Sequence, residues 1–310
     1  MVDESWFEKN EAIILGGGDV EKFGSIKVIP TKEAGVKRAY SITADILAFR
    51  RCSRQYGYFA VKGYVPAQAT QLYFGIVIHE VLDRAHKQFS GLMEGREKGI
   101  PSDNDIEAYH RTVTEALRSR GIRPYSRKAE ASALEYLQRF NRTQGPKLYP
   151  RVKDTEHKLK ADFKDFYMHG VVDVLVSGDG KPNELEIWDY KGSKKVESDS
   201  EEMRNYTFQM QVYSELYKKR HGEYPARAIL CFLGEEKSEN QLVEVTLESK
   251  AAQDAVQLFA RTVDEIELRR DKDDWSPPSK VPSKETCGAC DIRWDCSTAF
   301  RAYRFPMRKP

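Results

Sequence analysis

No stretch of this sequence is apolar for long enough to cross a lipid bilayer. The longest apolar runs, such as 228–233, are short, whereas a membrane-spanning helix needs about 20 apolar residues. The N-terminus, Met-Val-Asp-Glu-Ser, has neither the basic residues nor the apolar stretch of a secretory signal peptide. We therefore expect a cytoplasmic protein that does not bind a membrane.

The sequence also has little excess of either charge. Its 50 Lys and Arg residues nearly balance 48 Asp and Glu residues, and the net charge is +2. Basic residues gather around Tyr125 and in 301–309; such stretches can bind a phosphate backbone, but a solvated surface explains them equally well. No GxxxxGK[ST] phosphate-binding loop is present, so any ATP-driven unwinding must come from a separate partner.

Cysteine is scarce, with five residues in the chain. Three of them form the pattern Cys287-x2-Cys290-x5-Cys296, and Cys52 lies far upstream. This spacing in an intracellular chain favours metal or cluster ligation over disulfides. Four thiolates can hold either zinc or a [4Fe–4S] cluster, and the softness of sulfur does not separate the two. Cys231 lies in an apolar run, and we expect it to be a core residue of a buried strand.

The hydrophobic pattern changes from helical to strand-like near Pro150. Helices are predicted from Ser41 to Cys52 and over 70–90, 103–120 and 128–142. Strands 155–162, 166–176 and 184–191 should form a meander, followed by helix 203–220, strands 226–233 and 241–247, and helix 249–270. This order predicts an α/β core.

We expect a single large domain, because 40% of the residues are hydrophobic and the chain is long enough to bury a sizeable core. The predicted parts are an N-terminal extension over 1–38 and one domain over 39–310. Within that domain we distinguish a mainly helical part (39–150), an α/β catalytic core (151–272) and a C-terminal cysteine segment (273–310).

Two short motifs bring carboxylates and a lysine to the predicted strands. They are Gly170-Val-Val-Asp173 and Asp189-Tyr-Lys191. Side chains alternate along a strand, so Asp189 and Lys191 share one face. If the strand of Asp173 pairs alongside, the two carboxylates come close and repel unless a cation such as Mg²⁺ or Mn²⁺ lies between them. Such a site suits phosphodiester hydrolysis, with Lys191 orienting or deprotonating a water. An ordinary surface ion pair could have the same spacing.

Six motifs occur in order along the chain and extend this pattern. They are Ser41-Ile-Thr-Ala-Asp-Ile-Leu-Ala-Phe-Arg-Arg-Cys52 with Tyr56, Gly75-Ile-Val-Ile-His79, Gly170-Val-Val-Asp173, Asp189-Tyr-Lys191-Gly192, Gln209-Met-Gln-Val-Tyr213 and the final cysteines. In these motifs the sequence resembles the iron–sulfur nucleases of the RecB/AddB-type branch of the PD-(D/E)xK superfamily. This branch includes CRISPR adaptation nucleases and eukaryotic helicase-nucleases. The resemblance runs from about Tyr40 to Cys296.

The resemblance implies a restriction-endonuclease-like α/β fold. In this fold a mixed central sheet is flanked by helices, and the family adds a helical N-terminal insertion and a C-terminal Fe–S region. The family uses one CxxC pair, a third cysteine and a distant fourth for its [4Fe–4S] cluster, whereas zinc ribbons usually use two CxxC pairs. The resemblance therefore implies a [4Fe–4S] cluster on Cys52, Cys287, Cys290 and Cys296.

The resemblance also implies the residues of a catalytic site. A Mg²⁺ or Mn²⁺ ion would be bound by His79, Asp173, Asp189 and the carbonyl of Tyr190. Lys191 corresponds to the catalytic lysine of the family. Gln209 and Tyr213, one helical turn apart, would support that lysine and the DNA strand.

Other polar residues near these motifs have ordinary explanations. A histidine such as His79 on a helix is usually only a satisfied polar residue, and Asp83 and His86 on the same face would permit a rival metal site. However, His79-Glu80 is not followed by the second histidine of an HExxH zinc motif. We place His86 on the surface and give structural roles to the carboxylates Glu156 and Glu186.

The sequence therefore predicts a metal-dependent DNA nuclease. We expect an exonuclease acting on DNA ends or single strands, working with a separate superfamily 1 helicase or in a repair or antiviral defence complex. One alternative is a non-catalytic DNA-binding or scaffolding subunit of a helicase-nuclease complex. Another is a structural module that binds zinc through the cysteines.

Overall fold

The computed structural model describes residues 37–65, 70–124, 126–163 and 165–304. Residues 38–304 within these ranges form one unit by their contacts, whereas nearly all of the extension predicted over 1–38 lies outside the described residues. None of the described helices has both the length and the hydrophobicity needed to cross a membrane.

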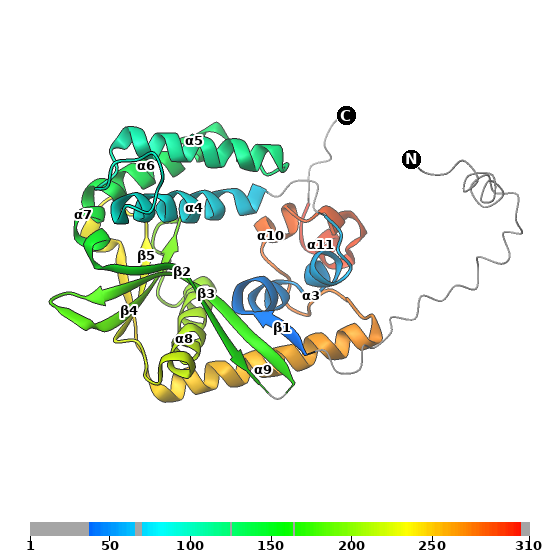
Figure 1. Ribbon diagram of the computed structural model, residues 1–310. Coiled ribbons are helices and arrows are strands. Elements are labelled where there is room, and N and C mark those ends of the chain that lie inside the picture. The colour runs from blue at the N-terminus through cyan, green and yellow to red at the C-terminus, as the bar shows by residue number, and fades with distance from the viewer. Residues whose placement is uncertain (1–36, 66–69, 125, 164, 305–310) are drawn as a thin grey trace, which may run out of the picture. The chain divides into compact units, whose positions relative to one another are not determined.

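A mixed six-stranded sheet forms the centre of the described unit (Figure 1). The strands are β1 (Arg38–Ser41), β2 (Val152–Asp162), β3 (Phe166–Gly178), β4 (Lys181–Lys191), β5 (Arg227–Phe232) and β6 (Leu242–Val245). Their order is β1-β3-β4-β5-β6, with β2 also paired to β3. The predicted antiparallel meander is confirmed as β2, β3 and β4, while β1 is parallel to β3 and β5 is parallel to β4.

Strand β3 changes its partner along its length. Its C-terminal part pairs with β4 from Val174 onward, and its N-terminal part, Phe166–His169, pairs with β1. Strand β2 pairs with β3 across both parts, so β4 and β1 must follow one another along the other edge of β3. Asp173 lies at the point where β3 leaves β4, and the sheet opens there.

Helices cover both faces of the sheet (Figure 1). On one face lie α4 (Thr70–Ser90), α5 (Asp103–Ser119), α6 (Arg127–Thr143) and α7 (Gly145–Leu148), whose buried side chains pack with Trp188 and Tyr190 of β4. On the other face lie α8 (Glu201–His221) and α9 (Ser249–Lys272), which pack with Ile187 and Leu230. The five predicted helices among these agree with the structure to within about two residues. The predicted α/β fold with a mixed sheet flanked by helices is confirmed.

Short helical segments flank the sheet at both ends of the described chain. Near the N-terminal end these are the π-helical turns η2 (Ile42–Leu47) and η3 (Gly57–Val61), with α2 (Ala48–Arg51) and α3 (Ser53–Tyr56) between them. Ser41 caps the first turn by accepting a hydrogen bond of 2.9 Å from the N–H of Ala44. The remaining segments are η4 (Tyr149–Arg151), η5 (Ser238–Asn240), α10 (Lys284–Gly288), η6 (Asp291–Asp295) and α11 (Ser297–Ala302).

Helix α8 packs closely against β3 because Gly170 has no side chain. A Cβ atom at Gly170 would lie 2.5 Å from Cε1 of Tyr213 and 3.4 Å from Cδ1 of Leu216. The glycine of the Gly170-Val-Val-Asp173 motif therefore allows the ring of Tyr213 to lie directly on the strand that carries Asp173.

We predict that Gly170→Ala destabilises the protein by about 1–3 kcal/mol, because the added methyl group overpacks this contact. The matched control is Gly75→Ala on α4, where a Cβ atom meets nothing within 4 Å. That change should stabilise the helix by about 1 kcal/mol. Urea denaturation of the two variants gives both free energies of unfolding, and equal values would contradict the close packing at Gly170.

Candidate active site

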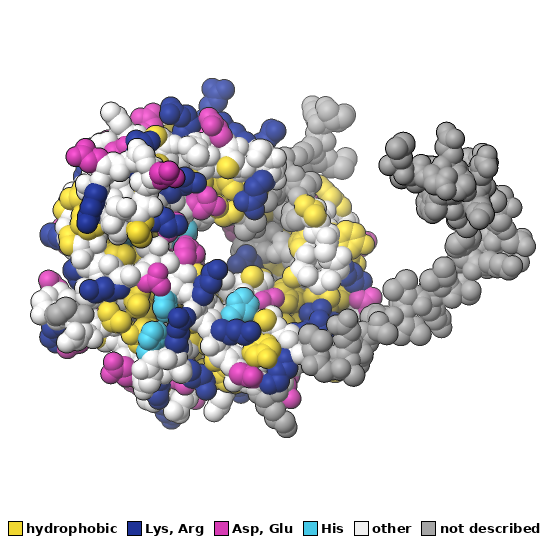
Figure 2. Space-filling model, in the orientation of Figure 1, with side chains coloured by type: hydrophobic (Ala, Val, Ile, Leu, Met, Phe, Trp, Pro, Cys, Tyr) yellow, Lys and Arg dark blue, Asp and Glu magenta, His cyan; other side chains and the backbone are white. Residues whose placement is uncertain are grey.

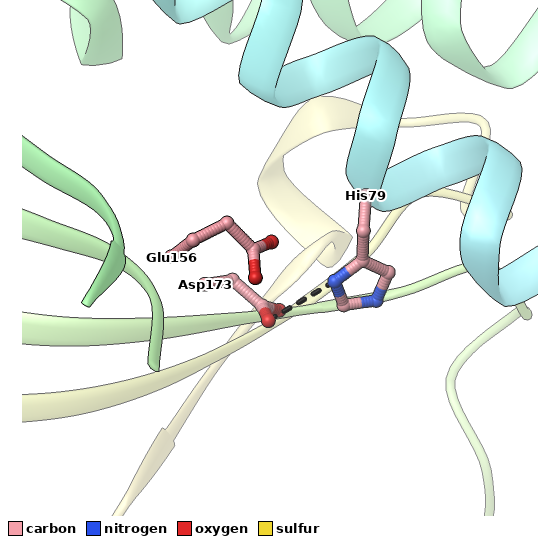
Figure 3. A group of neighbouring side chains, drawn as sticks. All are labelled: His79, Glu156 and Asp173. Carbon is pink, nitrogen blue, oxygen red and sulfur yellow. Dashed lines mark ion pairs between the residues drawn. The ribbon is translucent and has the colours of Figure 1, made fainter. Parts of the chain in front are cut away.

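Three side chains with metal-ligating atoms converge where the sheet opens. His79 projects from α4 toward Glu156 on β2 and Asp173 on β3 (Figure 3). One ligand atom from each residue lies within 4.8 Å of those of the other two. Nδ1 of His79 lies 3.0 Å from Oδ1 of Asp173. In the space-filling view, a hollow lies between α4 and the strands β2 and β3 (Figure 2).

A local irregularity in both strands explains how Glu156 reaches this group. The pairs Thr155–Val174 and His157–Val172 place Glu156 directly across from Asp173. Glu156 has a φ of 50°, in the left-handed region, which costs a residue other than glycine about 1–3 kcal/mol. Strained backbone of this kind often occurs at functional sites.

Because of this irregularity, neighbouring residues lie on the same face of the sheet. Thr155 donates a hydrogen bond of 2.7 Å to Asp83 of α4, and the next residue, Glu156, also faces α4. From the sequence we expect a structural role for Glu156, because it opens the strand ahead of Asp173, whereas the structure places its carboxylate with His79 and Asp173. The sequence carries no signal for this irregularity, since left-handed φ usually marks glycine, and the residue here is glutamate.

The carboxylate of Asp173 replaces a missing strand partner. Its Oδ2 accepts a hydrogen bond of 2.6 Å from the N–H of Tyr190, and its Oδ1 contacts His79. A carbonyl ligand from Tyr190 was predicted, whereas the contact that the structure shows is made by the N–H. The carbonyl ligand remains a prediction.

Burial and charge act on His79 in opposite directions. Burial lowers the pKa of His79, but the adjacent carboxylate of Asp173 outweighs burial, and the pKa rises to about 9. Without a cation, His79 therefore carries a proton beside Asp173. A divalent ion bound by both residues would displace that proton.

His86 is buried, so our placement of this residue on the surface is wrong. Its side chain is 2% exposed, and Nε2 lies 3.0 Å from the hydroxyl oxygen of Tyr190. Burial lowers the pKa of His86 to about 4, so the imidazole is neutral. His86 lies two helical turns after His79 on the same face of α4, and that face covers the sheet. Glu186 is also buried, and its Oε2 forms an ion pair with Nη2 of Arg151 at 3.0 Å. This contact is in keeping with a structural role.

Asp189 and Lys191 form a buried pair next to the three-residue group. Oδ2 of Asp189 lies 2.6 Å from Nζ of Lys191, and Asp189 is 2% exposed. The strand alternation predicted from the sequence thus brings these two side chains to one face. Burial raises the pKa of Asp189, and the ammonium of Lys191 opposes this rise.

Gln209 joins this pair to α8. Its Nε2 donates to Oδ1 of Asp189 at 2.8 Å and to the hydroxyl oxygen of Tyr213 at 3.0 Å. Its Oε1 accepts from Nζ of Lys191 at 2.9 Å. Nζ of Lys191 also lies 4.1 Å from the ring centroid of Tyr206. The structure therefore brings the predicted residues Asp189, Lys191, Gln209 and Tyr213 into one network, which holds the lysine in a single position.

Four of the five cysteines line one cavity. Cys52 comes from the start of α3, and the others, Cys287, Cys290 and Cys296, come from the C-terminal segment. Burial raises the pKa of Cys287 to about 11, and the other three thiols contribute. Among the described residues, no three sulfur atoms lie within 4.8 Å of one another, although ligands of one tetrahedral zinc ion lie about 4 Å apart. Cys231 is fully buried in β5, as expected.

One protein family matches most of this chain. The family model of the PD-(D/E)XK nuclease superfamily matches residues 44–297. A solved structure from Eubacterium rectale, to which exonuclease activity is attributed, is 13% identical, with a TM-score of 0.42 over 76% of this chain and 77% of that one. The structure of SSO0001 is 14% identical, with a TM-score of 0.35 over 71% and 95%. Neither likeness is close enough to carry an argument. No curated protein matches the chain.

We predict that Glu156→Gly separates backbone strain from ligand chemistry. Glycine accepts the left-handed φ, so the free energy of unfolding should rise by about 1 kcal/mol, while loss of the carboxylate should weaken Mn²⁺ binding roughly tenfold or more. Glu156→Gln keeps the strain and should weaken Mn²⁺ binding equally without the gain in stability. Urea denaturation and calorimetric titration with Mn²⁺ measure the two effects. Wild-type Mn²⁺ affinity in both variants would remove Glu156 from the site.

Proposed function

Because the chain belongs to the PD-(D/E)XK nuclease superfamily, we propose that it is a metal-dependent deoxyribonuclease, acting as an exonuclease on DNA ends or single strands. The observation that carries this proposal is the convergence of His79, Glu156 and Asp173 beside the buried Asp189–Lys191 pair. Two carboxylates and an imidazole suit a divalent ion, and a lysine fixed next to them suits a reaction at a phosphate.

The donor set favours a particular pair of ions. Carboxylate oxygens suit Mg²⁺ and Mn²⁺, and the nitrogen ligand His79 favours Mn²⁺. When bound, such an ion polarises the scissile phosphate and acidifies a water. We propose His79, Glu156 and Asp173 as its ligands. Asp189 and the carbonyl of Tyr190 remain proposed ligands.

Lys191 supplies positive charge at a fixed position. Asp189 and Gln209 hold its ammonium group by contacts of 2.6 and 2.9 Å, and the Tyr206 ring lies beside it. A preorganised cation stabilises the negative charge that develops on the phosphate during hydrolysis without a cost of reorganisation. We propose that Lys191 also orients the attacking water, and that Gln209 and Tyr213 position Lys191.

The cysteine cavity supports a second bound group. We propose that Cys52, Cys287, Cys290 and Cys296 hold a [4Fe–4S] cluster of the kind found in RecB/AddB-type nucleases. The shared cavity of the four cysteines supports one group bound by all of them. Its role would be structural, since it would link α3 to the C-terminal segment.

The resemblance to RecB/AddB-type nucleases also suggests a helicase partner. Nucleases of the RecB/AddB type work with superfamily 1 helicases, and this sequence contains no phosphate-binding loop. A separate helicase would supply single strands to the site, within a repair or antiviral defence complex.

We predict that the purified protein degrades end-labelled DNA when Mn²⁺ or Mg²⁺ is added, and that Mn²⁺ gives the higher rate. Asp173→Asn and Asp189→Asn should each lower the rate roughly a hundredfold or more, because each removes a carboxylate of the proposed site. A time course with single- and double-stranded substrates measures the rates.

The control is Asp179→Asn in the exposed turn between β3 and β4, where Asn-Gly is as favourable as Asp-Gly. Its rate should match that of the wild type. Equal cleavage by all four proteins would exclude this site, and no cleavage by the wild type would favour the non-catalytic DNA-binding subunit.

We predict that Cys290→Ser abolishes the broad visible absorbance of an iron–sulfur cluster and lowers solubility, because one of four ligands is lost. Cys231→Ala, at a buried cysteine outside the cavity, should retain the absorbance. Spectra and metal analysis after anaerobic purification provide the test. Zinc without absorbance in the wild type would replace the cluster with a zinc site.

A further inference from the structure

The β2–β3 hairpin has one covered face and one open face beyond the site. On β2, the buried side chains of His157, Leu159 and Ala161 alternate with exposed Lys158 and Lys160. On β3, buried Met168, Gly170 and Val172 alternate with half-buried Tyr167, His169 and Val171. The buried set faces α8, since Gly170 lies against Tyr213. The other set shares its face with Asp173.

The open face carries two lysines, two aromatic rings and, at its far end, Asp162. Strand pairing places Lys158 beside Val171, Lys160 beside His169 and Asp162 beside Tyr167, and Nζ of Lys160 lies 3.9 Å from the ring centroid of Tyr167. We name Lys158, Lys160, Tyr167 and His169 the hairpin track. Lys and Arg side chains gather over this part of the molecule in the space-filling view (Figure 2).

The hairpin track continues directly from the site. Tyr167 lies six positions before Asp173, which corresponds to roughly 20 Å along an extended strand. Residues on the same face recur at every second position, so the cations and rings form a row rather than a scattered patch. Glu156 and Asp173 by themselves repel a phosphate backbone, and the nearest same-face residue after Glu156 on β2 is the cation Lys158.

We propose that the hairpin track binds single-stranded DNA and guides it to the site, a proposal that rests on the nuclease function proposed above. Lys158 and Lys160 contact successive phosphates, and Tyr167 and His169 stack against unpaired bases. Positive charge along a groove combined with aromatic rings is the general arrangement for binding single strands without sequence preference. A duplex hides its base faces in its own stack, so the rings favour the single strand.

Lys158 and Lys160 could instead prevent aggregation, and the experiment must distinguish this role from DNA binding. Within the part of the chain that the structure describes, β2 pairs only with β3 and is therefore an edge strand. Lysines on edge strands prevent aggregation. In that case their removal would increase association between molecules and leave DNA binding unchanged.

The first test is the binding of a fluorescein-labelled oligothymidine by the full-length protein, with Ca²⁺ in place of Mg²⁺ or Mn²⁺ so that binding is measured without cleavage. For Lys158→Ala/Lys160→Ala we expect weaker binding and a smaller dependence of log K on log salt, by about 1.4, because each phosphate contact in a single strand contributes about 0.7. The matched control, Lys250→Ala at an exposed lysine of α9, should keep the wild-type affinity and slope. The proposal would be overturned if the double variant bound oligothymidine with the affinity and salt dependence of the wild type. If light scattering also showed larger particles, the lysines would have the edge-strand role instead.

The second test concerns the ring of Tyr167. Tyr167→Leu should weaken binding of the single strand about fivefold or more, because stacking on an aromatic ring is lost, whereas Tyr167→Phe keeps the ring and should bind normally. If Tyr167→Leu weakened the binding of single-stranded and duplex DNA equally, the assignment of the hairpin track to single strands would be overturned.

These measurements are independent of catalysis. If the wild type binds oligothymidine through the hairpin track but cleaves nothing with either metal, the proposed function fails and the hairpin track stands. If the wild type cleaves DNA and the double lysine variant binds normally, the proposed function stands and the hairpin track fails.

Discussion

The partner change of β3 at Asp173 is the constraint on which the rest of the site depends. A strand that pairs with β4 over one half and with β1 over the other leaves backbone groups near the change without their usual partners. Buried backbone groups without a hydrogen bond are costly. The side chain of Asp173 accepts a hydrogen bond from the N–H of Tyr190. The residue at which the two strands separate therefore also provides an acceptor for a backbone group that the separation leaves without a strand partner. The opening gives α4 access to the strands, and His79 enters there.

The polar residues around this opening separate into two groups with different physical requirements. Asp189 and Lys191 are buried, and charges removed from water must be paired and hydrogen-bonded. Gln209 meets that requirement, because its amide both donates to Asp189 and accepts from Lys191. His79, Glu156 and Asp173 are less buried, and the contacts of Asp173 are with the N–H of Tyr190 and with His79. One group is therefore rigid and charge-balanced, while the other holds an excess of negative charge toward the hollow.

Much of this arrangement follows from local sequence patterns. The helix over Thr70–Ser90 and the meander of β2, β3 and β4 could be predicted because each is long and strongly periodic, and the alternation in β4 correctly put Asp189 beside Lys191. Strand β1 was not predicted, because four residues show too little periodicity. Its parallel pairing also depends on residues that are distant in the sequence.

The errors occurred where tertiary structure overrides periodicity. Glu156 reaches the site through one left-handed residue in β2, which alternation cannot reveal. His86 is polar and was placed on the surface, but the helix face that carries His79 continues over the sheet and buries it. Tertiary contacts, rather than residue type, decided both positions.

The cysteine cavity has a consequence for how the protein is made. Cys52 is translated more than 230 residues before Cys287, Cys290 and Cys296, which complete its cavity. The strands that carry the acidic residues are therefore synthesised well before Cys52 and these three cysteines can meet. A nascent chain that ends before this segment lacks the closing contact, so the cavity forms only after the segment has been translated.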